Sequence, residues 1–169
     1  MNLLIYVLSV FCHIIAAVVW VGGILFLVLV VVPAARKPPL QAHRAMLFEV
    51  VGSAFRPIGW ICLVVLVGTG LTNLHFRGVL NSIHDPAFWN SPFGQVLGVK
   101  VIVVSLLILL SMVHDFWIGP ESSRASREAP GADATLRLRR IASWMGRVSA
   151  LLALLVILLG VMLVRGRPW

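Results

Sequence analysis

The sequence predicts an all-α integral membrane protein, a single domain over residues 1–169 folded as a four-helix up-and-down bundle. Hydrophobic residues make up 60% of the 169 residues and charged residues only 12%, and a soluble domain of this length cannot bury so much apolar surface. The chain also contains four apolar stretches that reach the length of about 20 residues needed to cross a hydrocarbon core. Basic residues gather in the loops between them. The expected environment is therefore a lipid bilayer.

The first predicted span has no Lys or Arg before it and is too long for the core of a signal peptide, so we expect it to be retained. Pro33, Pro38 and Pro39 follow it, and proline lacks the amide that a helix needs to continue. The four predicted spans cover residues 3–32, 55–76, 96–118 and 141–164.

Two segments between the spans have predicted structures of their own. The segment Gln41–Val51 has apolar residues at helical spacing and predicts a short helix lying on the membrane surface. Pro57 then either starts the second span or kinks a longer helix. The segment Gly119–Ala134 is rich in Ser, Ala and charged residues and predicts the most mobile loop of the chain.

The net charge of +8 follows a membrane-topology pattern, so we expect no nucleic-acid partner. The loops after the first and third spans carry Arg36, Lys37, Arg44, Arg56, Arg124, Arg127, Arg137, Arg139 and Arg140. The opposite side carries only Arg77, Arg165 and Arg167. The positive-inside rule then places both termini outside. This pattern predicts a multi-pass protein of the bacterial inner membrane.

His13 is the sharpest functional clue, because it lies inside the apolar first span and an ionisable group there is costly without a partner. His13, Ala16, Ala17, Trp20 and Gly23 recur at spacings of three and four, so they share one helix face. That face therefore carries a possible ligand, His13, next to small residues that leave room for a cofactor, and Trp20, whose flat ring could pack against it.

Other ionisable residues divide between the two halves of the predicted bundle. His75 closes the second span on the same side as His13. Lys100 and His114 share one stripe of the third span but are separated by 14 positions, about 21 Å along a helix, so they cannot bind one metal atom. The outer half therefore gathers His13, His75 and Lys100, and the inner half has His114 beside Asp115.

These residues predict a b-type haem in the outer half, used for electron transfer or redox chemistry. A neutral imidazole suits haem iron and also copper, and a haem needs an apolar slot and cations for its propionates. The predicted cofactor-binding residues are His13, Trp20, His75 and Lys100, and the predicted metal ligands are His13, His75 and His114. Copper, or a histidine that only hydrogen-bonds between helices, remains an alternative. A single haem is favoured over two, since the inner half offers no second ligand within the spans.

The sequence contains no phosphate-binding glycine loop, nucleophile elbow or paired carboxylates, which argues against hydrolysis and phosphoryl transfer. It remains open whether the chain is an oxidoreductase or the haem-carrying subunit of one. A quinone or a redox protein would be its partner, and the chain could serve within a larger membrane complex. Cys12 and Cys62 are expected to pack as small hydrophobic residues.

The segment His13–Gly23 resembles the first-helix motif of the CopD-domain membrane proteins, the copper resistance D family. Phe93–Lys100 together with His114–Pro120 resembles that family's third helix, and Leu163–Gly166 is similar to its ending. The resemblance covers most of the chain and implies a membrane protein that handles copper.

The same pattern, a His followed by Ala and Trp-x-Gly and later a Lys and a His, also resembles HemJ, a family of four-helix haem-binding membrane proteins. This resemblance implies that His13 is the haem ligand and Lys100 an essential basic residue. The third helix departs from HemJ because it ends His-Asp-Phe instead of in a His-His pair followed by Tyr. The chain also lacks the extra helices and the Met/His-rich segments of the larger copper proteins.

Overall fold

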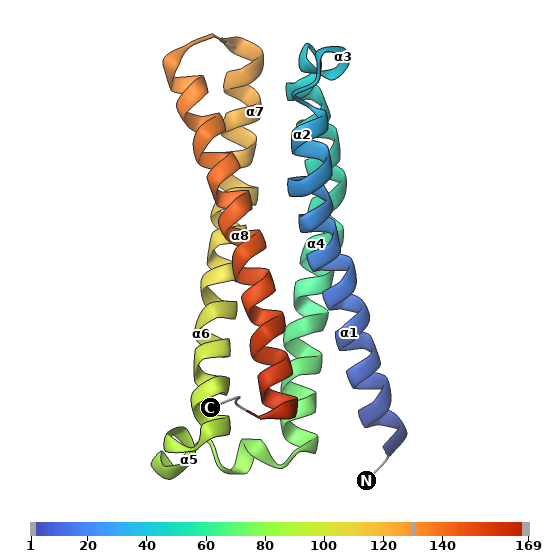
Figure 1. Cartoon of the computed structure of the whole chain (residues 1–169), viewed down its shortest axis with the longest axis vertical. Helices are drawn as coiled ribbons and strands as arrows, with labels where there is room; N and C mark the ends of the chain where they lie inside the picture. The colour runs from blue at the N-terminus through green and yellow to red at the C-terminus, as the bar shows by residue number, and fades with distance from the viewer. Residues whose placement is uncertain (1–2, 130, 167–169) are drawn as a thin grey trace.

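Four long helical rods run side by side in the computed structural model, which describes residues 3–129 and 131–166 (Figure 1). The first rod joins α1 (Leu3–Phe26), η1 (Leu27–Val31) and α2 (Val32–Ala34), and the second is α4 (Arg44–Phe76). The third joins α6 (Pro92–Val113), η3 (His114–Ile118) and α7 (Gly119–Glu128), and the fourth is α8 (Asp133–Arg165). Each rod is long and apolar enough to cross a membrane. The predicted all-α, four-helix membrane fold is confirmed.

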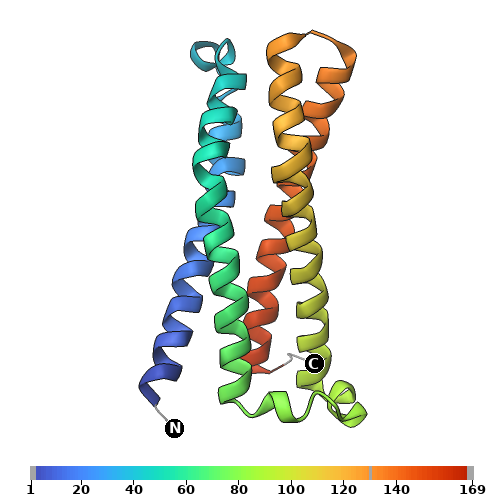
Figure 2. The same cartoon turned by 180° about the vertical axis from the view of Figure 1, so that it is seen from behind.

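The rods form two antiparallel pairs, α1 with α4 and α6 with α8 (Figures 1 and 2). The pairs meet mainly where α1 contacts α8 and where α4 contacts α7. One end carries both chain ends together with α5 (Pro86–Asn90) and η2 (Val79–Asn81), and we call it the termini end. The opposite end carries α3 (Pro38–Gln41) and α7, and we call it the α7 end. That the termini end faces outside stays a prediction; Arg167, which contributed to it, lies outside the described residues.

Two rods contain a π-helical segment, and a proline explains each one. A proline ring clashes with the carbonyl four residues before it, which a wider helical turn relieves. Pro33 stands four residues after Leu29 of η1, and Pro120 stands four residues after Phe116 of η3. The helix therefore widens at both places and continues instead of stopping.

The expected surface helix over Gln41–Val51 is wrong, because α4 runs unbroken from Arg44 through Pro57 to Phe76. The expected loop over Gly119–Ala134 is also wrong for most of its length, since α7 fills Gly119–Glu128. The π-helical segment η3 carries the third rod past Pro120 into α7, and the i,i+4 pair of Arg124 and Glu128 (2.9 Å) supports the last turn. The four rods contain the predicted spans and extend beyond them; the membrane boundaries themselves stay predicted.

The larger core cluster of the described residues joins α1, α4, α6 and α8. It consists of Ala16, Trp20, Val21, Cys62, Leu63, Leu107 and Ala153. A smaller cluster between α6 and α8 consists of Val96, Val103 and Leu159. Close approach depends on Gly23, since a Cβ there would lie 2.2 Å from an atom of the Phe55 ring. Small residues at helix contacts are the usual means of packing in membranes, where lipid is as apolar as the side chains. Cys62 is buried as expected, whereas Cys12 is exposed.

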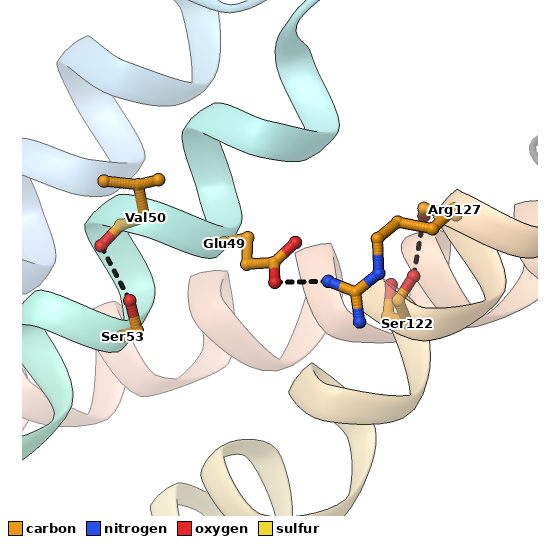
Figure 3. A network of polar contacts seen from close by, with 6 residues as sticks. Glu49, Val50, Ser53, Ser122 and Arg127 are labelled. Carbon is orange, nitrogen blue, oxygen red and sulfur yellow. Dashed lines mark hydrogen bonds and ion pairs between the residues drawn. The ribbon is translucent and has the colours of Figure 1, made fainter.

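Polar contacts fasten the two helix pairs at the α7 end. Glu49 of α4 forms an ion pair with Arg127 of α7 (Figure 3). On α7, the Ser126 hydroxyl donates to the Ser122 carbonyl (2.6 Å) and accepts from Arg139 Nε of α8 (2.8 Å). An exposed ion pair contributes little by itself. The network nevertheless links three rods at one level.

Candidate functional site

His13 is held by a hydrogen bond to the neighbouring helix. Its Nδ1 lies 2.8 Å from the Thr69 hydroxyl oxygen of α4, and that hydroxyl also donates to the Val65 carbonyl at 2.5 Å. A hydroxyl has one proton. With this proton assigned to the Val65 carbonyl, its shortest contact, the Thr69 oxygen accepts from Nδ1–H. Nε2 of the neutral ring therefore keeps its lone pair, which is the state in which histidine binds a metal while its other nitrogen is fixed by a neighbour.

The backbones of α1 and α4 are close at the same level. Ser9 donates a hydrogen bond to the Thr69 carbonyl (3.4 Å), one turn before His13. A Cβ on Gly70 would lie 3.6 Å from His13 Cε1, so the glycine backs directly onto the imidazole. The ring is thus fixed by a hydroxyl on one atom and by helix backbone on another.

Lys100 of α6 brings a positive charge near this ring. Its ammonium lies over α8, 3.5 Å from where a Cβ of Gly160 would be. The ammonium is close enough to His13 for its charge to act on the imidazole, and Arg77 acts in the same way on Lys100. None of the ion pairs found among the described residues includes Lys100. Among the described residues, Lys100 therefore has no carboxylate partner, and its charge reaches the His13 ring.

Asn73 is a feature of this half that sequence reasoning missed. It follows Thr69 by one turn on the same face of α4, and its side-chain oxygen is buried without a hydrogen-bond partner among the described residues. Most buried polar atoms are satisfied, so an orphaned acceptor needs an explanation. The sequence does contain a signal for this residue, because an amide side chain stands out inside an otherwise apolar span.

Trp20 and His75 lie apart from His13. Trp20 is seven residues further along α1, about 10 Å along the axis, and it is only 5% exposed in the core. His75 is exposed near the end of α4, with its ring edge-on to Phe76 at 5.9 Å. Within the described residues, no three His, Cys, Asp or Glu side chains are placed to hold a metal ion together. His13, His75 and His114 therefore do not form one site.

A second polar centre lies in the half nearer the α7 end. His114 Nδ1 lies 3.0 Å from Asp115 Oδ1 on η3. Asp115 Oδ2 accepts a hydrogen bond from Trp60 Nε1 of α4 at 3.1 Å. These residues border a cavity of about 140 Å³ between the two helix pairs, whose wall also includes Trp20 and Arg56. The aromatic wall predicted for His13 thus belongs to this cavity.

Fold and site together define a four-helix integral membrane protein with a polar centre in each half. Residues 49–163 match the sequence model of the family described as CopD, copper resistance protein D, and the chain belongs to this family. The match includes His75, Lys100 and His114 but begins after α1, so it leaves out His13 and Trp20. The likeness to HemJ stays a prediction.

One curated relative covers nearly the whole chain. It is an uncharacterized protein of Aquifex aeolicus (strain VF5), 33% identical over 157 residues that span 91% of this chain and 92% of the relative. The similarity therefore extends into α1. No solved structure matches the chain.

Proposed function

We propose that this CopD-family protein binds one b-type haem in the half near the termini end, with His13 as an axial ligand, and serves electron transfer. The observation that carries the proposal is the His13–Thr69 hydrogen bond, which leaves Nε2 available as a ligand. Second-shell bonds of this kind orient metal-binding histidines and raise their basicity. A bound haem would supply an iron that accepts and passes on single electrons.

The donor set suits haem better than a bare metal ion. A haem brings four nitrogens of its own and needs only one or two from the protein, whereas a bare copper ion needs several side-chain ligands. The described residues offer one fixed imidazole in this half and no cluster of three ligand-type side chains. Copper therefore has fewer donors here than it requires.

Lys100 is the residue that would hold the acidic edge of the haem. Propionates are carboxylates, and hydrogen bonds between ionised partners are the strong ones. The Lys100 ammonium has no carboxylate partner among the described residues and acts on His13 through its charge. The buried acceptor of Asn73 lies one turn beyond Thr69 and is available to a protonated carboxyl group.

Copper handling is the second candidate, and the family description favours it. In that case His13 would be one copper ligand, and the remaining ligands would have to come from side chains that the described residues do not place beside it. In either case we place the protein in the bacterial inner membrane with the termini end outside. A quinone, a redox protein or further subunits of a membrane complex would exchange electrons with it.

The test is the absorption spectrum and metal content of the protein purified from haem-replete membranes. We expect a Soret band that sharpens on reduction and about one iron per chain. His13→Ala should abolish or strongly shift that band, while His84→Ala, an exposed loop histidine, should leave it unchanged. Unchanged haem content in His13→Ala would contradict the proposal. A colourless protein containing copper would establish the second candidate instead.

A further inference from the structure

Both π-helical segments of the described chain border the cavity of about 140 Å³ between the helix pairs. Leu27 and Val28 of η1 line one side, and His114 and Asp115 of η3 line another. Segments of this kind occur frequently at functional sites. The prolines explain why each helix widens, but they do not explain why both widened turns face one cavity. The two helix pairs are therefore separated by a cavity at the level of the two π-helical segments.

The hydrogen-bonding groups of the cavity are Asp115, His114, Arg56 and the hydroxyls of Ser111 and Ser149. Both oxygens of Asp115 are engaged, one by His114 and the other by the Trp60 indole. With Nδ1 of His114 assigned to that contact, its Nε2 remains as an acceptor. Arg56 forms no ion pair among those found in the described residues. A ligand with a hydroxyl and a second oxygen can thus donate to His114 and accept from Arg56.

Charge and shape narrow the class of ligand. The wall contains one arginine and one aspartate, so an anion would meet Asp115 and a cation would meet Arg56, and an uncharged ligand fits best. Two indoles, Trp20 and Trp60, and the ring of Phe55 line the wall together with aliphatic side chains, and aromatic faces favour a flat ring. A cavity of about 150 Å³ accommodates one benzene ring. A single six-membered ring with a hydroxyl and a second oxygen fits this size and these polar groups.

We propose that this cavity binds the head group of a single-ring quinol, which donates a hydroxyl hydrogen bond to His114 and accepts one from Arg56. The proposal concerns binding alone. It does not depend on a haem at His13, because the cavity lies in the other half of the bundle.

The test is equilibrium dialysis of the detergent-solubilised full chain against 1,4-dihydroxybenzene, the unsubstituted single-ring quinol. Gly146 lines the cavity, and a Cβ there would meet nothing within 4 Å, so Gly146→Leu fills the space without a backbone clash. Gly68→Leu is the matched control, since Gly68 also has open space but lies outside the cavity. We expect Gly146→Leu to weaken binding at least about tenfold and Gly68→Leu to leave it within about twofold.

A second variant tests the polar contact. His114→Leu should weaken binding about tenfold, the value of one good hydrogen bond. His13→Ala should bind the quinol like the wild type even if it loses all haem, which separates this proposal from the previous one. Equal binding by the wild type, Gly146→Leu and His114→Leu would mean partition into detergent and would overturn the proposal. Equal affinity for a two-ring naphthoquinol would overturn the assignment to a single ring.

Discussion

The Thr69 hydroxyl accepts a hydrogen bond from His13 and donates its own proton to the Val65 carbonyl. One side chain of α4 thereby fixes both the orientation and the tautomer of the imidazole on α1. The pair also fastens two helices inside the apolar part of the bundle, where an unpaired imidazole N–H would be costly.

Thr69→Val should weaken haem binding, because valine has nearly the same shape but leaves His13 Nδ1–H without an acceptor. Loss of a second-shell partner costs about 10- to 100-fold in metal affinity, and the unpaired N–H costs about 1–3 kcal/mol of stability. Haem titration and thermal unfolding in detergent measure the two effects. Thr69→Ser keeps the hydroxyl and should behave like the wild type; equal behaviour of Thr69→Val would show that the bond has no role.

Lys100→Met should reduce haem retention by about 10- to 100-fold, since a hydrogen bond to a charged group contributes about 1.5–3 kcal/mol. Methionine keeps most of the unbranched side chain that lies over Gly160 and removes the ammonium group. Lys100→Arg keeps the charge and should retain most of the haem. Dissociation measured by transfer to apomyoglobin gives the affinities. Indistinguishable rates for Met and Arg would exclude a role for the charge.

Gly23→Ala should destabilise the bundle by about 1–3 kcal/mol, the usual cost of overpacking. The added Cβ would lie 2.2 Å from the Phe55 ring, so the ring must move. Gly22→Ala is the control, because a Cβ there meets nothing within 4 Å. The Phe55→Leu background should reduce the cost. The measurement is reversible unfolding in mixed micelles, and equal stability of the two alanine variants would contradict the packing of α1 on α4.

The termini end should face outside, as the positive-inside rule predicts. Asn81 is at this end and Glu121 is at the α7 end, and both are exposed. In a background without Cys12 and Cys62, a membrane-impermeant maleimide applied to intact cells should modify Asn81→Cys and spare Glu121→Cys. Permeabilised cells serve as the control and should show labelling at both positions. The reverse pattern in intact cells would invert the topology.

The ratio of haem to protein should be close to one and should not change in His114→Ala. His114 is engaged by Asp115 in the other half of the bundle from His13, and no further ligand-type cluster accompanies it among the described residues. A pyridine haemochrome assay on purified protein gives the ratio. A value near two that falls by one in His114→Ala would establish a second haem in that half.

The sequence by itself determined that the chain forms four membrane-crossing helices, because length and apolarity of a stretch are local properties that set whether it can span a bilayer. It also marked His13, Lys100 and His114 as unusual, since an ionisable side chain in an apolar run stands out without knowledge of its neighbours. The division of these residues between two halves followed from the constant rise of a helix.

Only the tertiary structure decided what each of these residues meets. In a bilayer the lipid-facing and helix-facing sides of a helix are both apolar, so a hydrophobic pattern does not show which face packs against which helix. The pairing of α1 with α4 placed Thr69 beside His13. The same pairing placed Trp20 in the core and in the wall of the His114 cavity. Spacing along one helix could not reveal this, because the partner residues come from helices more than 50 positions away in the chain.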